Sequence, residues 1–356
     1  MATAQVTSPG LLSRVSGMVG NLIKVSITKA PIGQTPRQAI WTLNKATLYR
    51  YTPVKPPEER HRVPLLLVFA LMNRSSILDL RPGNSFIEFM VHEGYDVYLM
   101  DWGAPGPEDA GMGLEDYVLD YIPRAVRKMK AVSGCETFNL LGWSIGAILS
   151  TLYASLRPAD GLKSLVLLTA PLDFTDTEQI TLARMTDERY FDVDSVLGAF
   201  GNMPAGLIDH GAKMLKPVEN FIGGYLRLLD HLDNPKIVDS WHAMNTWVND
   251  AIPLAGRAYR QLIMDFYRGN KLMNGTLTIR GERVDLGNLR ASLLNVIAQD
   301  DHITPPCQSA RLLGKVGSTD KQELRVAGGH IGVMAGSGAS KNTWPKVEAW
   351  IGAHSV

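Results

Sequence analysis

Short, almost uninterrupted apolar runs alternate along most of this chain with longer segments of helical spacing. Strands buried on both faces of a parallel sheet have this apolar character, because helices cover both sides. The runs predict strands at residues 63–69, 96–100, 137–141, 164–168, 292–298 and 323–326. Helical spacing predicts helices between them, for example over 85–92 and 114–130. The alternation predicts an α/β fold with a mostly parallel, doubly wound sheet.

The alternation stops in two places. Residues 173–274 are rich in methionine and aromatic residues at helical spacing, which predicts a helical cap over a gated, apolar cavity. Most of these aromatic residues are expected to form the ordinary core of that subdomain. Residues 30–60 are proline-rich and charged and predict an irregular approach. The predicted organisation is an N-terminal helical and irregular segment (1–60), a core (61–172 and 275–356) and the inserted cap (173–274).

An apolar stripe at helical spacing lies near the N-terminus and is interrupted by Arg14 and Lys24. Its members are Leu11, Leu12, Val15, Met18, Val19, Leu22 and Ile23. We expect this stripe to pack on the protein's own core; the alternative is that it lies on a lipid or polymer surface. The longest apolar run, residues 63–72, is too short to cross a bilayer, and residues 1–10 do not resemble a secretory signal.

The charge balance excludes one class of partner. The chain has 36 Lys and Arg against 35 Asp and Glu, so it lacks the basic excess typical of nucleic-acid binding. Cys135 and Cys307 are too few and too far apart for a disulfide scaffold or a metal site, and they are interpreted as free thiols in a reducing cytosol. We therefore expect a cytoplasmic protein without a bound metal or resident cofactor.

The segment Gly142-Trp143-Ser144-Ile145-Gly146 stands between a predicted strand and a predicted helix. This is the context of a nucleophile elbow, in which a sharp turn presents a serine. The two glycines leave room for the strand and the helix to approach each other. The positive end of the helix favours an oxyanion, so the N–H of Ile145 is one candidate donor. Met72, in the loop after strand 63–69, is the candidate for the second donor.

Two later loops supply the partners of the serine. Strand 292–298 runs into Asp300-Asp301, and the next strand runs into the glycine-flanked His330. The order Ser144, Asp301, His330 is that of the α/β-hydrolase fold. A serine hydroxyl is barely ionised near neutral pH, so a histidine must take its proton while a carboxylate holds the imidazole. Asp301 is preferred over Asp300 because the Asp-His-x-x-Pro-Pro context places it at the strand tip. The other histidines considered are interpreted as surface or structural residues: His92, His210, His231, His242 and His354.

Longer stretches at residues 65–106, 239–275, 295–306 and 328–333 carry a more specific resemblance. From about Leu48 to its C-terminus, the chain resembles the catalytic subunit of class III polyhydroxyalkanoate synthases. The resemblance implies transfer of 3-hydroxyacyl groups, such as 3-hydroxybutyryl, from coenzyme A onto a growing polyester through a covalent acyl-enzyme. It assigns the nucleophile to Ser144, the base to His330 and the acid to Asp301, which would also help activate the 3-hydroxyl of the incoming acyl-CoA.

The same resemblance implies partners as well as chemistry. Coenzyme A would enter as part of the substrate, the chain would form a homodimer, and it would work with an accessory subunit at the surface of cytoplasmic polymer granules.

One departure from the family pattern affects the chemistry. The family has cysteine in Gly-x-Cys-x-Gly-Gly, whereas this chain has Ser144, and Ala147 stands where a second glycine is usual. A thiolate beside a histidine passes acyl groups between thioesters at little cost, whereas serine needs a base and forms a less activated oxoester.

Three interpretations of Ser144 remain open: an engineered Cys-to-Ser exchange, a natural synthase variant, and a serine hydrolase of esters or polyesters on the same scaffold. The whole-chain resemblance favours the synthase scaffold. A hypothesis from a different class is that the chain is a catalytically weak protein that coats polymer granules and is anchored by the N-terminal stripe. The presence of the Ser-Asp-His set argues against this hypothesis.

Overall fold

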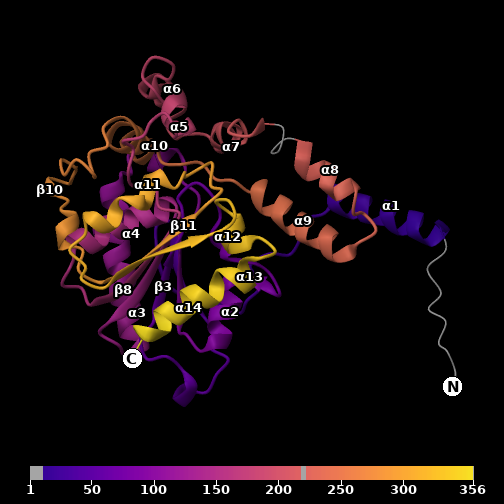
Figure 1. Ribbon diagram of the computed structural model, residues 1–356, viewed down its shortest axis with the longest axis horizontal. Coiled ribbons are helices and arrows are strands. Elements are labelled where there is room, and N and C mark those ends of the chain that lie inside the picture. Colours follow the sequence, from indigo (N-terminus) through magenta and orange to yellow (C-terminus); the bar gives the residue numbers. More distant parts are fainter. Residues whose placement is uncertain (1–10, 218–221, 356) are drawn as a thin grey trace.

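The computed structural model describes residues 11–217 and 222–355. Its central element is an eight-stranded sheet with the order β1-β2-β6-β3-β7-β8-β11-β12 (Figure 1). The strands are β1 (Arg37–Leu43), β2 (Ala46–Tyr51), β3 (Leu65–Val68), β6 (Val97–Asp101), β7 (Phe138–Trp143), β8 (Leu162–Leu168), β11 (Ser292–Ala298) and β12 (Lys321–Val326). Strand β2 is antiparallel to both neighbours, and all the other pairs are parallel. The strands predicted from apolar runs are therefore confirmed as β3, β6, β7, β8, β11 and β12.

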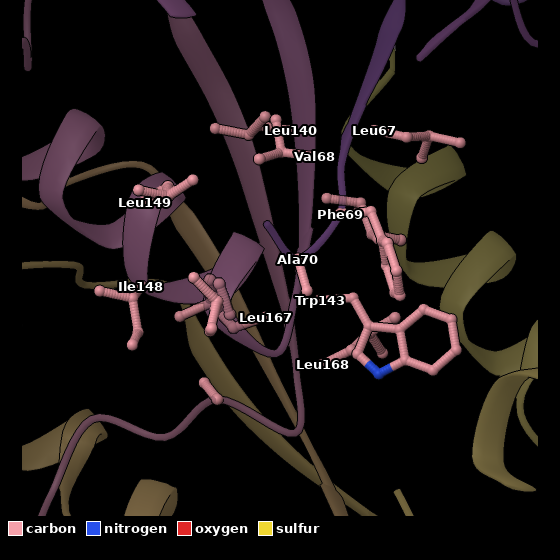
Figure 2. Packing of buried hydrophobic residues seen from close by; sticks show 14 of the residues in the cluster. Leu67, Val68, Phe69, Ala70, Leu140, Trp143, Ile148, Leu149, Leu167 and Leu168 are labelled. Carbon is pink, nitrogen blue, oxygen red and sulfur yellow. The ribbon is translucent and has the colours of Figure 1, made fainter. Parts of the chain in front are cut away.

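Helices flank this sheet and bury its apolar side chains. They include α2 (Phe86–Glu93), α3 (Ile122–Ser133), α4 (Ile145–Leu156) and α14 (Trp344–Ala353), with the π-helical turn η4 (Asp116–Tyr121) leading into α3. Phe86 and Phe89 of α2 pack against Trp344 of α14. Figure 2 shows the contact between α4 and the sheet, where Ile148 and Leu149 lie near residues of β3, β7 and β8. Both α4 side chains are buried, so this interface forms part of the main core.

Shorter elements fill the loops of the core. The short strands are β4 (Asp79–Arg81), β5 (Asn84–Ser85), β9 (Thr278–Ile279) and β10 (Glu282–Arg283). The 3-10 turns are η1 (Pro57–Glu59), η2 (Ser75–Leu78), η3 (Pro107–Asp109), η7 (Leu286–Asn288) and η8 (Leu312–Gly314). The short helices are α11 (Cys307–Ala310), α12 (Gly332–Ala335) and α13 (Ala339–Asn342).

The expectation that residues 30–60 are irregular is wrong for 37–51. These residues form the antiparallel pair β1–β2, joined at Asn44-Lys45, at one edge of the sheet. An edge strand is solvated along one side, so β1 carries polar residues and lacks the continuous apolar run of a central strand. The available signal was a short turn between two segments that contain β-branched and aromatic residues.

Between β8 and β9 the described chain forms only helices and connecting loops apart from one isolated bridge, Met203 to Leu254. The helices are α5 (Thr181–Met185), α6 (Val193–Phe200), α7 (Ala205–Lys213), α8 (Gly224–Leu229), α9 (Pro235–Val248), α10 (Gly256–Gln261) and the π-helical turn η6 (Leu262–Arg268). In Figure 1, α8 and α9 extend with α1 (Leu11–Ile27) to one side, away from the sheet.

The expectation that the N-terminal stripe packs on the protein's own core holds for only part of the stripe. Helix α1 packs in a small cluster separate from the main core, in which Val25 and the partly buried Met18 meet residues of α9 and of the segment around α8. Val19, Leu22 and Ile23 are 51%, 42% and 52% exposed. The side chains of Leu11, Leu12 and Val15 lie outside the described residues. A stripe at helical spacing predicts the helix but does not identify its contacts.

Among the described residues, no helix combines the length and the apolar character that a membrane span requires.

Candidate active site

Ser144 occupies a sharp turn between β7 and α4. Its backbone has φ 59° and ψ −122°, a conformation that a residue with a side chain adopts only under constraint. The constraint is visible, because the Ser144 amide donates a 3.0 Å hydrogen bond to the Leu168 carbonyl at the end of β8. The serine therefore sits at the carboxyl edge of the sheet, at the start of a helix.

The two glycines of the turn are required by close packing. A β-carbon at Gly142 would lie 2.7 Å from the carbonyl oxygen of Gly146 and 2.8 Å from the α-carbon of Ala147. A β-carbon at Gly146 would overlap the carbonyl oxygen of Val68 at the end of β3. Ala147 is itself fully buried in the elbow helix. The turn thus brings the first residues of α4 against the exit of β3.

His330 and Asp301 are joined by a hydrogen bond of 2.7 Å between Nδ1 and Oδ2. Both residues are buried, at 6% and 5% exposure. The other carboxylate oxygen of Asp301 accepts hydrogen bonds from the amides of Ile303 and Thr304, each at 2.8 Å. With a proton on Nδ1 facing Asp301, Nε2 of His330 is left as the basic nitrogen.

Asp300, the alternative acid, has a different contact. Its carboxylate accepts a 3.0 Å hydrogen bond from the Gly328 amide, and its own amide donates to the Gly328 carbonyl. Asp300 is exposed and ties the loop after β11 to the loop that carries His330. The carboxylate that contacts the imidazole is therefore that of Asp301.

Ser144 shares a sheet edge with this pair. It follows β7, Asp301 follows β11 and His330 follows β12, and these parallel strands lie in the order β7-β8-β11-β12. Within the part of the chain that the structure describes, no hydrogen bond joins Ser144 to His330. Such contacts are often long in ligand-free enzymes and tighten when substrate binds. The structure joins the acid to the imidazole and places the serine at the same edge without a direct bond.

Neither candidate oxyanion donor is used in another hydrogen bond. Across the described ranges, the amides of Ile145 and Met72 donate to no backbone or side-chain acceptor. Ile145 opens α4, and Met72 lies in the loop that leaves β3 four residues after Val68. Because Gly146 lies against Val68, these two free N–H groups belong to segments that meet at the elbow.

Contacts between the helical insertion and the Met72 loop have no signal in the sequence. The Ile252 amide donates to the Met72 carbonyl at 3.2 Å, and the Trp247 indole donates to the Arg74 carbonyl at 2.7 Å. The guanidinium of Arg74 also lies 3.5 Å from the carboxylate of Asp250. Trp247 and Arg74 are 173 positions apart, so no local pattern links them.

Asp173 connects the two ends of the insertion. Its carboxylate accepts hydrogen bonds from Thr175, at 2.9 Å from the amide and 2.6 Å from the hydroxyl, and from the Asn270 amide group at 3.3 Å. Arg311 lies 3.2 Å away. Burial opposes the charge on Asp173, but these hydrogen bonds and the nearby guanidinium outweigh it and hold the pKa of the carboxyl below its ordinary value.

Two cavities are lined by neither Ser144 nor His330. One of about 670 Å³ lies within the helical insertion, and a small one of about 20 Å³ lies beside Leu71 and Trp102. The larger one is lined by Thr177, Glu178, Ala183, Arg184, Asp187, Glu188, Arg189, Tyr190, Tyr267 and Arg268. The described residues contain no group of three or more His, Cys, Asp or Glu side chains placed to hold a metal ion.

Comparisons of the whole fold place the chain in one structural class. Residues 80–336 match the family model of the alpha/beta hydrolase fold. The crystal structure of Paleococcus ferrophilus monoacylglycerol lipase superposes with a TM-score of 0.52 at 20% identity, over 86% of this chain and 99% of the lipase. A putative lipase from Sulfolobus solfataricus gives a TM-score of 0.55 at 14% identity, over 91% of this chain and 98% of that protein. At these identities the likeness shows the fold alone, and the predicted α/β-hydrolase fold is confirmed.

Relatives with similar sequences identify the family more specifically than the fold does. Poly(3-hydroxyalkanoate) polymerase subunit PhaC of Allochromatium vinosum is 35% identical, over 90% of this chain and 89% of that protein. The protein of the same name from Synechocystis is 34% identical, over 90% of this chain and 85% of that protein. For the Haloferax mediterranei protein the identity is 36%, over 93% of this chain and 66% of the longer relative. This chain therefore belongs to the PhaC family of poly(3-hydroxyalkanoate) polymerases within the alpha/beta hydrolase fold.

Proposed function

We propose that this chain polymerises 3-hydroxyacyl groups, delivered as coenzyme A thioesters, into polyester and releases coenzyme A. It is an acyltransferase, and 3-hydroxybutyryl is the acyl group that we favour. The observation that carries the proposal is the buried His330–Asp301 pair at the same sheet edge as the elbow residue Ser144, in a chain of the PhaC family.

In the first half-reaction, Nε2 of His330 takes the hydroxyl proton of Ser144 as Oγ attacks the thioester carbonyl. The N–H groups of Ile145 and Met72 stabilise the negative charge that develops on the carbonyl oxygen. The carbon–sulfur bond then breaks, and the imidazolium returns the proton to the departing thiolate. The products are an acyl-Ser144 oxoester and coenzyme A, and Asp301 keeps the imidazole oriented throughout.

In the second half-reaction, the 3-hydroxyl of another 3-hydroxyacyl-CoA attacks the acyl-serine carbonyl. His330, with Asp301 behind it, accepts the hydroxyl proton and passes it to Ser144 Oγ as the oxoester bond breaks. The product is a polyester chain that is one unit longer and is attached to coenzyme A as a thioester. Ser144 then attacks this thioester in the same way as before, which transfers the chain back to Ser144 and releases coenzyme A. No resident cofactor takes part.

The use of serine as the nucleophile affects both the rate of chain growth and the competition between chain growth and hydrolysis. A serine oxoester is less activated toward the next hydroxyl than the thioester of a cysteine enzyme, so chain growth on Ser144 should be slow. Water competes for the same acyl-enzyme, which makes a serine hydrolase of esters or polyesters the alternative outcome. Transfer is favoured over hydrolysis by the similarity of the chain along most of its length to poly(3-hydroxyalkanoate) polymerase subunits.

The test compares the unmodified chain with Ser144→Cys and Ser144→Ala. With 3-hydroxybutyryl-CoA we expect coenzyme A release together with polymer from the unmodified chain, a large gain for Ser144→Cys, and none for Ser144→Ala. Cleavage of short p-nitrophenyl esters without polymer, and no gain from Ser144→Cys, would favour the hydrolase. Granule binding without either activity would favour the coat protein.

The finer features of the proposal concern placement and assembly. We assign the helices of 173–274 the role of a cap that admits substrate by moving. We place the enzyme in the cytoplasm on polymer granules, as a homodimer with an accessory subunit, as the class III resemblance implies. Granule contact is supported by the exposed apolar side chains of two helices that pack against α9. They are Val19, Leu22, Ile23 and Ile27 of α1, and Tyr225, Leu226 and Leu229 of α8.

A further inference from the structure

The loop that carries Met72 is held through its carbonyl groups from two sides. On the core side, the indole of Trp102 donates to the Phe69 carbonyl at 3.0 Å. On the side of the insertion, the Ile252 amide donates to the Met72 carbonyl at 3.2 Å, and the Trp247 indole donates to the Arg74 carbonyl at 2.7 Å. The peptide groups around Met72 are therefore oriented jointly by the sheet and by the cap.

The hydrogen bond from the Trp247 indole is the shortest of these three, and Trp247 lies in the last turn of α9. Its side chain is 4% exposed and packs in the main core. An indole N–H can only donate a hydrogen bond, so the edge of the Trp247 ring that carries it must face the Arg74 carbonyl. The same hydrogen bond holds the Arg74 carbonyl in its orientation. The ion pair of Arg74 with Asp250, two residues after α9 ends, adds a second link between the same segments.

We propose that Trp247 is a positioning residue for catalysis, which aims the Met72 N–H at the oxyanion and couples assembly of the oxyanion hole to closure of the cap. The inference rests on the proposed function, because it needs Met72 as an oxyanion donor. When the cap moves away, the Met72 and Arg74 carbonyls lose both donors from the insertion, and the loop loosens. When the cap closes over substrate, the donors return and the hole is complete.

The coupling predicts a selective kinetic effect. Charge develops on the carbonyl oxygen only in the transition state, so a misplaced donor lowers kcat and leaves substrate binding nearly unchanged. Removal of a whole oxyanion donor costs about 10²–10³ in kcat. A donor that is present but loosely held costs less, and we expect about a tenfold loss in kcat with KM within about twofold.

The experiment uses Trp247→Phe, which keeps an aromatic ring and removes only the indole N–H and part of the ring volume. The matched control is Trp241→Phe on the same helix, about 1.7 turns earlier. Trp241 packs against Tyr225, away from the Met72 loop. The readouts are kcat and KM for coenzyme A release, the thermal midpoint, and the rate at which a p-nitrophenyl phosphonate modifies Ser144, since its tetrahedral adduct occupies the oxyanion hole.

We expect Trp247→Phe to lower kcat and the phosphonate rate together, at a KM and a thermal midpoint similar to those of Trp241→Phe. Equal kinetics for the two variants would overturn the inference. If Trp247→Phe does not fold, the inference is tested with Ile252→Pro. This substitution lies in an irregular segment and deletes the N–H that donates to the Met72 carbonyl. An unchanged kcat in the Ile252→Pro variant would also overturn the inference. If the unmodified chain neither releases coenzyme A nor reacts with the phosphonate, the proposed function itself fails.

Discussion

Gly146, in the first turn of α4, lies directly against the carbonyl oxygen of Val68, the last residue of β3. This contact has a functional consequence, because it sets the start of the elbow helix beside the loop that leaves β3. The free N–H groups of Ile145 and Met72 come from these two segments. Figure 2 shows the two residues that follow Val68, Phe69 and Ala70, near Trp143 of the elbow turn.

Gly146→Ala should disrupt this junction, because the added methyl group has no space beside the rigid Val68 carbonyl. Overpacking of this kind costs about 1–3 kcal/mol, so we expect a clear drop in the thermal midpoint and loss of coenzyme A release. Gly198→Ala is the control, since a β-carbon at Gly198 in α6 meets nothing within 4 Å. A Gly146→Ala variant as stable and active as Gly198→Ala would contradict the close packing at the elbow.

The two neighbouring aspartates should respond very differently to loss of charge. Asp301→Asn removes the carboxylate that orients the His330 imidazole, and we expect coenzyme A release to fall by about 10³–10⁴. Asp300→Asn keeps a side-chain oxygen for the Gly328 amide and should retain most activity. The measurement is single-turnover acylation of Ser144 in both variants. Comparable losses would show that Asp301 has no special role.

Asp173 should make the base of the cap sensitive to acid. Its folded pKa is lowered, so its contribution to stability is present above the unfolded pKa of about 3.9 and is lost as the pH falls through the folded value. We expect Asp173→Asn to lower the thermal midpoint at pH 7 and to flatten its decline below about pH 4.

Asp176→Asn is the matched control for this prediction, because Asp176 also pairs with Arg311 but is partly exposed. Asp176→Asn should lower the thermal midpoint at pH 7 by less than Asp173→Asn does. Parallel curves for the unmodified chain and Asp173→Asn through the acid range would contradict the prediction.

The exposed stripe of α1 should govern adsorption to polymer and not the chemistry. Ile23 and Ile27 are 52% and 76% exposed, and each buried isoleucine contributes about 2 kcal/mol. Replacing both with glutamate should weaken binding to polyester particles by tenfold or more, while coenzyme A release from soluble substrate stays the same. The control places glutamate at the exposed Ser16 and Ser26, which adds equal charge without removing apolar surface. Equal adsorption of both double variants would exclude the stripe as the anchor.

The interior strands and the elbow could be predicted from the sequence because their signals are local. A central parallel strand is buried on both faces and therefore mostly apolar, as β7 and β11 are apart from Asn139, Ser292 and Asn295. A strand–turn–helix with two glycines has few alternatives. The edge strand β1 was missed because one of its sides meets solvent, so its sequence is partly polar and has no continuous apolar run like that of a central strand. The setting of α1 was missed because helical periodicity reveals an apolar face without its partner.

By itself, the sequence determined the fold class, the order in which Ser144, Asp301 and His330 occur, and the resemblance to a family of polyester synthases. Each of these depends on residue type and spacing along the chain. Only the tertiary structure decided that Asp301 and not Asp300 contacts His330, and that Trp247 reaches across to the Met72 loop. The physical reason is that these contacts depend on the directions of side chains and carbonyl groups from distant segments, which are fixed only when the sheet and the inserted helices pack together.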